Sequence, residues 1–402
     1  MSTPNKVPAR ISLPSGFVFG EVPTAAPALR PAVALAAAAP TPPPGLGPLA
    51  AFVGTWNGNG FNTIFRPNNS VTPTALPSPV TPGDNILELN LTSESLAFSP
   101  SLGSVPNRGT TPQGDIFLNG VPYLQTIQDV TTPGQSVGIH AEPGLWMNIP
   151  STNDPVEGPT VARMGSIPHG TTIQAQGTFL SVNGPPIINP VSITPFVTGQ
   201  TPVKLIPFPS QTAATQGTPR IPQDLTTFIA NGTITQAMLD DPNTVLRNQI
   251  AQQTITATTV IIIDTDPAAP LFGGGTDNVA FLQGNPPTSS PNAQALQMRA
   301  IFWIETVQAP ILVQPFPFGP DPLILPCPPS VPGQVVPTFC VQPPPAAITQ
   351  TVSIIVTYTQ IQYTQLVLLN FNGLTWPHVS VATLVPADPV QVPASVWPAT
   401  GS

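Results

Sequence analysis

The sequence predicts an all-β protein: a closed antiparallel β-barrel with proline-rich loops, a small helical insertion and an extended N-terminal arm. Of its 402 residues 59 are proline, and proline in a helix interior costs about 3 kcal/mol, so long helices are largely excluded. Only 7% of the residues are charged while 41% are apolar, which is not the composition of a disordered chain. Segments rich in Val, Ile, Thr, Phe and Leu recur along the folded part, as expected for strands.

The N-terminal arm comprises residues 1–46. It is rich in proline and alanine and has no hydrophobic periodicity, so we expect it to be extended and ordered only by packing, and to be a possible contact in a homo-oligomer. Lys6 and Arg10 are not followed by a continuous apolar stretch, which predicts a cytoplasmic protein without a classical signal peptide, non-classical secretion being left open. Apolar runs are interrupted before the roughly 20 residues of a membrane helix, so no membrane span is expected.

One barrel domain is expected over residues 47–390, followed by a tail at 391–402. Strand-like segments bounded by Pro, Gly or Asn lie at 54–66, 85–98, 123–130, 136–149, 160–165, 171–182, 253–264, 279–283, 294–307, 347–363, 365–371 and 379–385. Strands without intervening helices favour an antiparallel sheet that closes on itself or forms a sandwich. Neither half of the chain has enough strands to close a barrel alone, which favours a single domain.

The segment 222–252 breaks this strand pattern. Asp241 followed by Pro242 matches a helix N-cap with proline at the first helical position, and apolar residues then recur at helical spacing. The sequence therefore predicts a short helical insertion. Long proline-rich loops are expected at 184–221 and 313–345.

Few side chains are available to bind ions or nucleic acid. The net charge is −8 and the ten basic residues are scattered, which excludes a nucleic-acid partner. Asp264, Asp266 and Asp277 have side chains that could bind a cation, but their irregular spacing favours solvated loop carboxylates. For Cys327 and Cys340 two interpretations remain open, separate thiols or a disulfide that pins the long loop. Metal binding by the two cysteines is not expected, since no histidine lies near either one.

The three histidines of the chain are the candidate functional residues. Period two along a strand places His140 and Glu142 on the same face, either as a satisfied buried pair or as polar groups directed into a cavity. His378 follows Pro377 at the start of the last strand, and a histidine there is usually structural. His169 lies in an expected turn between strands.

Five segments taken in order indicate a family. Gly54-Thr-Trp-Asn-Gly-Asn-Gly60 is followed by 86–98, by 122–129, by Ile139-His-Ala-Glu-Pro-Gly-Leu-Trp146 and by Trp376-Pro-His-Val-Ser-Val-Ala-Thr-Leu384. They resemble the strands of the nitrobindin family of heme-binding β-barrels, which are calycin-like. The family's motifs are an opening G-T-W-x-G-x-G, an H-x-E-x-G-Y/F strand and a closing H-L-x-A-x-L strand. The resemblance covers about half of the chain.

The resemblance implies a b-type heme with His378 as its axial iron ligand. It implies that His140 lies on the distal side, binds near the cofactor and acts catalytically on nitric oxide, peroxynitrite or peroxide. Peroxynitrite isomerase or peroxidase-like activity would follow. Because no distal cation is identified, gas binding or isomerisation is favoured over peroxidase chemistry.

This sequence also departs from the family. The chain is more than twice as long as a single small barrel, and Pro143 predicts a bulge in the His140 strand. Candidate cations for the heme propionates are Arg66, Arg108 and Arg163. Two other functions stay open: a non-enzymatic carrier of an apolar small molecule, and a structural, self-assembling protein.

Overall fold

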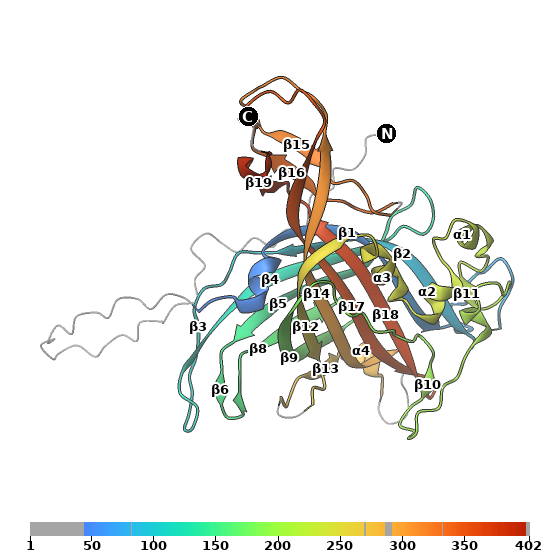
Figure 1. The fold of residues 1–402 in the computed structure, drawn as a ribbon. Helices are drawn as coiled ribbons and strands as arrows, with labels where there is room; N and C mark the ends of the chain where they lie inside the picture. The colour runs from blue at the N-terminus through green and yellow to red at the C-terminus, as the bar shows by residue number, and fades with distance from the viewer. Residues whose placement is uncertain (1–43, 82, 269–270, 286–291, 332, 399–402) are drawn as a thin grey trace, which may run out of the picture.

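Ten strands form a closed antiparallel β-barrel in the computed structural model, which describes residues 44–398 except 82, 269–270, 286–291 and 332 (Figure 1). The strand order is β2-β1-β18-β17-β14-β12-β9-β8-β5-β4, and β4 pairs with β2 to close the barrel. The barrel strands are β1 (Gly54–Pro67), β2 (Asn85–Phe98), β4 (Ile116–Asp129), β5 (Val137–Ile149), β8 (Thr160–Ile167), β9 (Thr171–Asn183), β12 (Thr254–Asp264), β14 (Gln294–Val313), β17 (Val352–Phe371) and β18 (Leu374–Pro386). The predicted fold class is confirmed. Residues 1–43, most of the predicted arm, lie outside the described residues, and so does the oligomer contact assigned to them.

Short elements decorate the barrel. The additional strands are β3 (Val105–Asn107), β6 (Thr152–Asn153), β7 (Val156–Glu157), β10 (Phe196–Val197), β11 (Arg220–Ile221), β13 (Gly275–Asn278), β15 (Leu323–Pro326), β16 (Thr338–Val341) and β19 (Val390–Val392). The helices are η1 (Gly47–Phe52), η2 (Pro209–Gln211), α1 (Thr226–Ala230), α2 (Gln236–Asp240), α3 (Thr244–Ile250), α4 (Ala280–Gln283) and η3 (Ala394–Val396). None of the helices in the described ranges has the length and apolar character needed to cross a bilayer.

Several element predictions need correction. The strand expected at 279–283 is largely helix α4, which ends at Gly284 with a φ of 73°, a conformation that glycine adopts readily. The loop expected at 313–345 contains β15 and β16, and the two strands expected between 347 and 371 are one strand, β17. Helices α1 to α3 do lie in the predicted insertion. However, α3 begins at Thr244, because Asp241 and Pro242 form the turn that precedes it.

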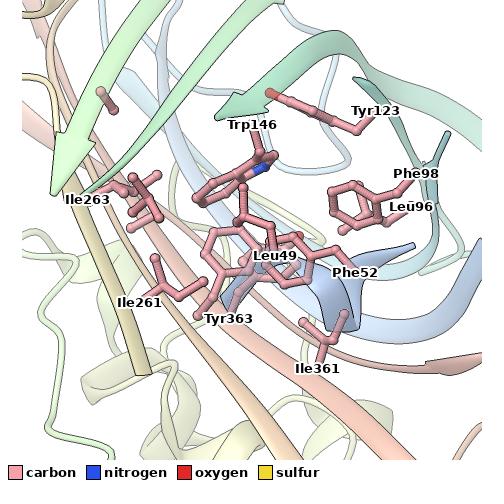
Figure 2. Packing of buried hydrophobic residues seen from close by; sticks show 14 of the residues in the cluster. Leu49, Phe52, Leu96, Phe98, Tyr123, Trp146, Ile261, Ile263, Ile361 and Tyr363 are labelled. Carbon is pink, nitrogen blue, oxygen red and sulfur yellow. The ribbon is translucent and has the colours of Figure 1, made fainter. Parts of the chain in front are cut away.

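Helix η1 closes one end of the barrel with apolar side chains. Leu49 and Phe52 are fully buried, and the Phe52 ring lies 4.7 Å from the Phe98 ring and 5.4 Å from that of Trp146, measured between centroids (Figure 2). The indole Nε1 of Trp56 donates a 2.8 Å hydrogen bond to the carbonyl oxygen of Phe52. The first turn of chain after the arm is thereby tied to the first barrel strand.

Strand β1 is buried along its inner face and, from Phe61 onward, along its outer face as well, whereas Asn57 and Asn59 on the outer face are exposed. On the inner face a Cβ at Gly58 would lie only 1.9 Å from the carbonyl oxygen of Thr383, so glycine is required for β1 to approach β18 this closely. On the outer face Phe61 and Phe65 pack in a second apolar cluster that includes Leu246 of α3. The helical insertion therefore covers this side of the barrel wall (Figure 1).

The β14–β17 hairpin continues beyond the barrel and carries a small separate sheet. The pairing runs to Val313 and Val352, and β15, β16 and β19 form the three-stranded sheet beside it (Figure 1). Phe339 and Ile354 lie in the apolar cluster that joins the two parts. Cys327 is buried in this cluster and Cys340 lies in β16; both are free thiols, so the disulfide alternative is not realised.

Candidate functional site at the histidine end of the barrel

All three histidines lie toward the barrel end opposite η1, which we call the histidine end. His378 is near the start of β18, His140 is near the start of β5, and His169 is in the turn between β8 and β9. Antiparallel strands bring these positions to one end, whereas η1 precedes β1 at the other end. His140 and His378 are partly buried, while His169 is exposed and lies in a turn as predicted.

His378 is held by an amide from the neighbouring strand. The Nδ2 atom of Asn62 lies 2.8 Å from Nε2 of His378 and 2.8 Å from Oγ of Ser380. Because an amide nitrogen can only donate, Nε2 accepts the hydrogen bond and the neutral ring carries its proton on Nδ1. Burial, and to a lesser degree the nearby His140 and His169, lower the pKa of His378 to about 3. The imidazole is therefore neutral at physiological pH.

His140 and Glu142 face the barrel interior together, as the period of two predicted. Nε2 of His140 lies 3.2 Å from Oε2 of Glu142, whose side chain is fully buried. The bulge expected at Pro143 is wrong, because Pro143 pairs in register with Leu124. The register shift lies instead at Ile139, which has no partner on β4. Its neighbours Gly138 and His140 pair with the consecutive residues Gln128 and Ile127.

A buried arginine neutralises Glu142. Nη2 of Arg163 lies 2.7 Å from Oε1 of Glu142, and the exposed fractions of the two side chains are 1% and 0%. Nε of Arg163 donates to the hydroxyl of Tyr123 at 2.9 Å and Nη1 to Oε1 of Gln365 at 2.8 Å. Burial would raise the pKa of Glu142, but Arg163 and the hydrogen bonds from His140 and Tyr123 outweigh it and lower the pKa to about 2. Glu142 is thus ionised.

Gly165 makes room for this network. A Cβ at Gly165 would lie 2.4 Å from Oε1 of Glu142 and 2.7 Å from the hydroxyl oxygen of Tyr123. Any larger residue would push the carboxylate away from Arg163. The β8 segment from Arg163 to Gly165 therefore supplies both the cation and the space for its partner.

A second buried carboxyl, that of Glu94, belongs to a separate hydrogen-bond cluster. Its Oε2 accepts from the Tyr363 hydroxyl at 2.6 Å and its Oε1 from Oγ1 of Thr92 at 3.0 Å. Burial raises the pKa of Glu94. The two buried carboxyl groups of the barrel interior thus have pKa values shifted in opposite directions.

Apolar residues neighbour the two interior histidines in the sheet. Ile127 is the register partner of His140, Val367 that of His378, and Met298 that of Val367. The described residues contain no cluster of three or more His, Cys, Asp or Glu side chains able to hold a metal ion, so the three aspartates considered above form no such site. The neutral imidazole of His378, beside these apolar side chains, is instead the kind of group that can serve as a single axial ligand once Asn62 releases Nε2.

The three arginines considered for propionates all have carboxylate partners. Arg66 pairs with Glu88, Arg108 with Asp115 and Arg163 with Glu142.

Sequence reasoning missed several residues of the site, namely Asn62, Glu94, Tyr123, Tyr363 and Gln365. The usable signal was a polar residue at every second position of otherwise apolar strands, which marks inward-facing polar groups. Glu94 follows this pattern, because Glu88, Asn90, Thr92 and Glu94 stand at every second position of β2, whereas Asn62 of β1 does not.

Comparison of the chain with protein-family models, with curated proteins and with solved structures gave no match in any of the three.

Proposed function

We propose that this protein is a nitrobindin-like heme-binding β-barrel, with His378 as the axial ligand of a b-type heme at the histidine end. One observation carries the proposal: a neutral imidazole, that of His378, lies inside the wall of a closed barrel near a second interior histidine, His140. Neutral imidazole is the usual protein ligand of heme iron, and a barrel interior can enclose a small molecule.

The proposed axial donor would become available to heme after one side-chain movement. Nε2 of His378 must be released by the Asn62 amide, which still has Ser380 and Asn90 as hydrogen-bond partners. Val367, beside His378 in the sheet, offers an apolar surface to a porphyrin face. Bound heme would supply a site for nitric oxide, peroxynitrite or peroxide, of which gas binding or peroxynitrite isomerisation is the more conservative assignment.

His140 is assigned the proton chemistry of the site. The ionised carboxylate of Glu142 faces Nε2, so Nε2 carries a hydrogen and donates it. Nδ1 then has its lone pair available, since it has no hydrogen-bond partner among the described residues. His140 can therefore take up a proton at Nδ1 and return it to a bound ligand.

Arg66 is the candidate partner for a propionate. It lies near the end of β1, four residues beyond Asn62, and its side chain is 35% exposed beside Glu88. A propionate at the histidine end would compete with Glu88 for this guanidinium.

Titration with hemin, followed by the Soret absorbance, tests the proposal. The wild type is expected to bind one hemin per chain. His378→Ala is expected to weaken binding by more than about 100-fold, because replacing a residue that only contacts a metal ligand already weakens metal binding by about 10–100-fold. His169→Ala is the matched control and retains wild-type affinity. His140→Ala retains heme but changes the reaction with nitric oxide or peroxide. Equal affinity of the wild type and His378→Ala, or no Soret shift in any variant, would overturn the assignment.

A further inference from the structure

A groove of about 370 Å³ lies on the outer surface of the barrel, away from the histidines. It crosses β12, β14 and β17 and is bordered by residues 187–191 of the loop that follows β9. Its volume is within the range of small-molecule sites.

The loop that borders the groove is fixed in place by the region of α3. Nδ2 of Asn243 donates to the carbonyl oxygen of Asn189 at 2.7 Å, and Nη1 of Arg247 donates to that of Ile188 at 3.2 Å. Oδ1 of Asp241 accepts from the backbone N–H of Val191 at 3.0 Å. These three hydrogen bonds hold the loop in place as one wall of the groove.

The floor of the groove is apolar. It consists of outward-facing side chains of three adjacent strands, namely Val260, Ile262, Ile301, Trp303 and Leu366. On the loop wall Ile187 is 85% exposed even though the loop is pinned. Apolar side chains gathered along a groove in this way favour a hydrocarbon chain.

One charged group lines the groove. The neutral polar groups of the lining already have hydrogen-bond partners. Oγ1 of Thr364 donates to Oδ1 of Asn243 at 2.6 Å, and Nδ2 of Asn243 donates to the loop. Arg299 is exposed and makes no ion pair within the described part of the chain.

The carboxylate opposite Arg299 in the sheet forms no ion pair with it among the described residues. Asp264 is its cross-strand neighbour in register. However, Oδ1 of Asp264 already accepts from Nε2 of Gln297 and from the backbone N–H of Asp266, both at 2.8 Å. The Arg299 guanidinium thus remains available for an external anion.

We propose that this groove binds an amphiphilic carboxylate of the fatty-acid type, with its chain over Ile262, Ile301 and Trp303 and its carboxylate on Arg299. The apolar floor recognises the chain, and the guanidinium recognises the head group through charge-assisted hydrogen bonds. The site is on the outer wall, so it is independent of heme and of His378.

Calorimetric titration with dodecanoate tests this site, with dodecyltrimethylammonium as a probe of equal chain length and opposite charge. The wild type is expected to prefer dodecanoate by about ten-fold or more, because a hydrogen bond to a charged group contributes about that much. Arg299→Gln removes this preference. Ile187→Asp, at an exposed position, weakens the binding of dodecanoate.

Two controls keep the test specific. Lys204→Gln removes a cation from an exposed loop residue that does not line the groove and leaves binding unchanged. His378→Ala also leaves dodecanoate binding unchanged, which separates this site from the heme proposal. Thermal unfolding checks that each variant is folded. Equal affinity for the two probes, unchanged dodecanoate affinity in folded Arg299→Gln, or no dodecanoate binding by the wild type would each overturn the proposal.

Discussion

Nε2 of His378 lies 2.8 Å from Nδ2 of Asn62, on the neighbouring strand β1. The lone pair that iron would need is therefore occupied by an amide hydrogen. The same amide nitrogen donates to Ser380, which fixes the orientation of the group. Asn62 thus orients the His378 ring, and it would compete with a metal ion for Nε2.

Replacing Asn62 with Ala is expected to strengthen hemin binding, because the competing hydrogen bond to Nε2 of His378 is lost. The same change lowers the free energy of unfolding by about 1–3 kcal/mol, since Ser380 is buried and loses its partner. Hemin titration and urea denaturation measure the two effects. Asn90→Ala, which leaves the Asn62–His378 bond in place, is the control. Weaker hemin binding in folded Asn62→Ala would show that Asn62 supports the site instead of competing with it.

Arg163→Met is expected to lower the free energy of unfolding at pH 7 by about 3–5 kcal/mol, because it leaves the buried carboxylate of Glu142 without its cation. The double variant Arg163→Met with Glu142→Leu removes both charges and should recover much of the loss. Urea denaturation of the three proteins checks this. A double variant as unstable as Arg163→Met alone would mean that packing, and not charge, accounts for the effect.

Glu305→Gln is expected to raise stability at pH 8 and to change it little near pH 5. Burial raises the pKa of Glu305 from 4.5 to about 8, and its Oε1 has no hydrogen-bond partner among the described residues. The unfolded chain loses this proton above about pH 4.5 whereas the folded chain keeps it, so the wild type loses stability as the pH rises from about 4.5 to 8. Glutamine does not titrate and avoids that loss.

Urea denaturation of the wild type and Glu305→Gln at the two pH values measures the difference. A stability difference that is the same at pH 5 and pH 8 contradicts the assignment of a protonated Glu305.

The barrel was predictable because its signals are local. Alternating residues such as His140 and Glu142 indicate a strand and its inner face. The Asn62–His378 contact joins residues 316 apart in the chain, and it depends on the register between β1 and β18, which no local pattern determines. The same holds for the Arg163–Gln365 bond. The wrong prediction of a strand at 279–283 has a different cause, because a short apolar run fits a strand or a helical turn equally well.

The most direct test of the central claim is the hemin complex of His378→Gly, measured with and without added imidazole. If His378 is the axial ligand, the variant loses hemin affinity, and imidazole in solution restores the wild-type Soret spectrum by occupying the vacated position. His169→Gly serves as the matched control, with wild-type affinity and no response to imidazole. Wild-type hemin affinity in His378→Gly without imidazole would contradict the claim.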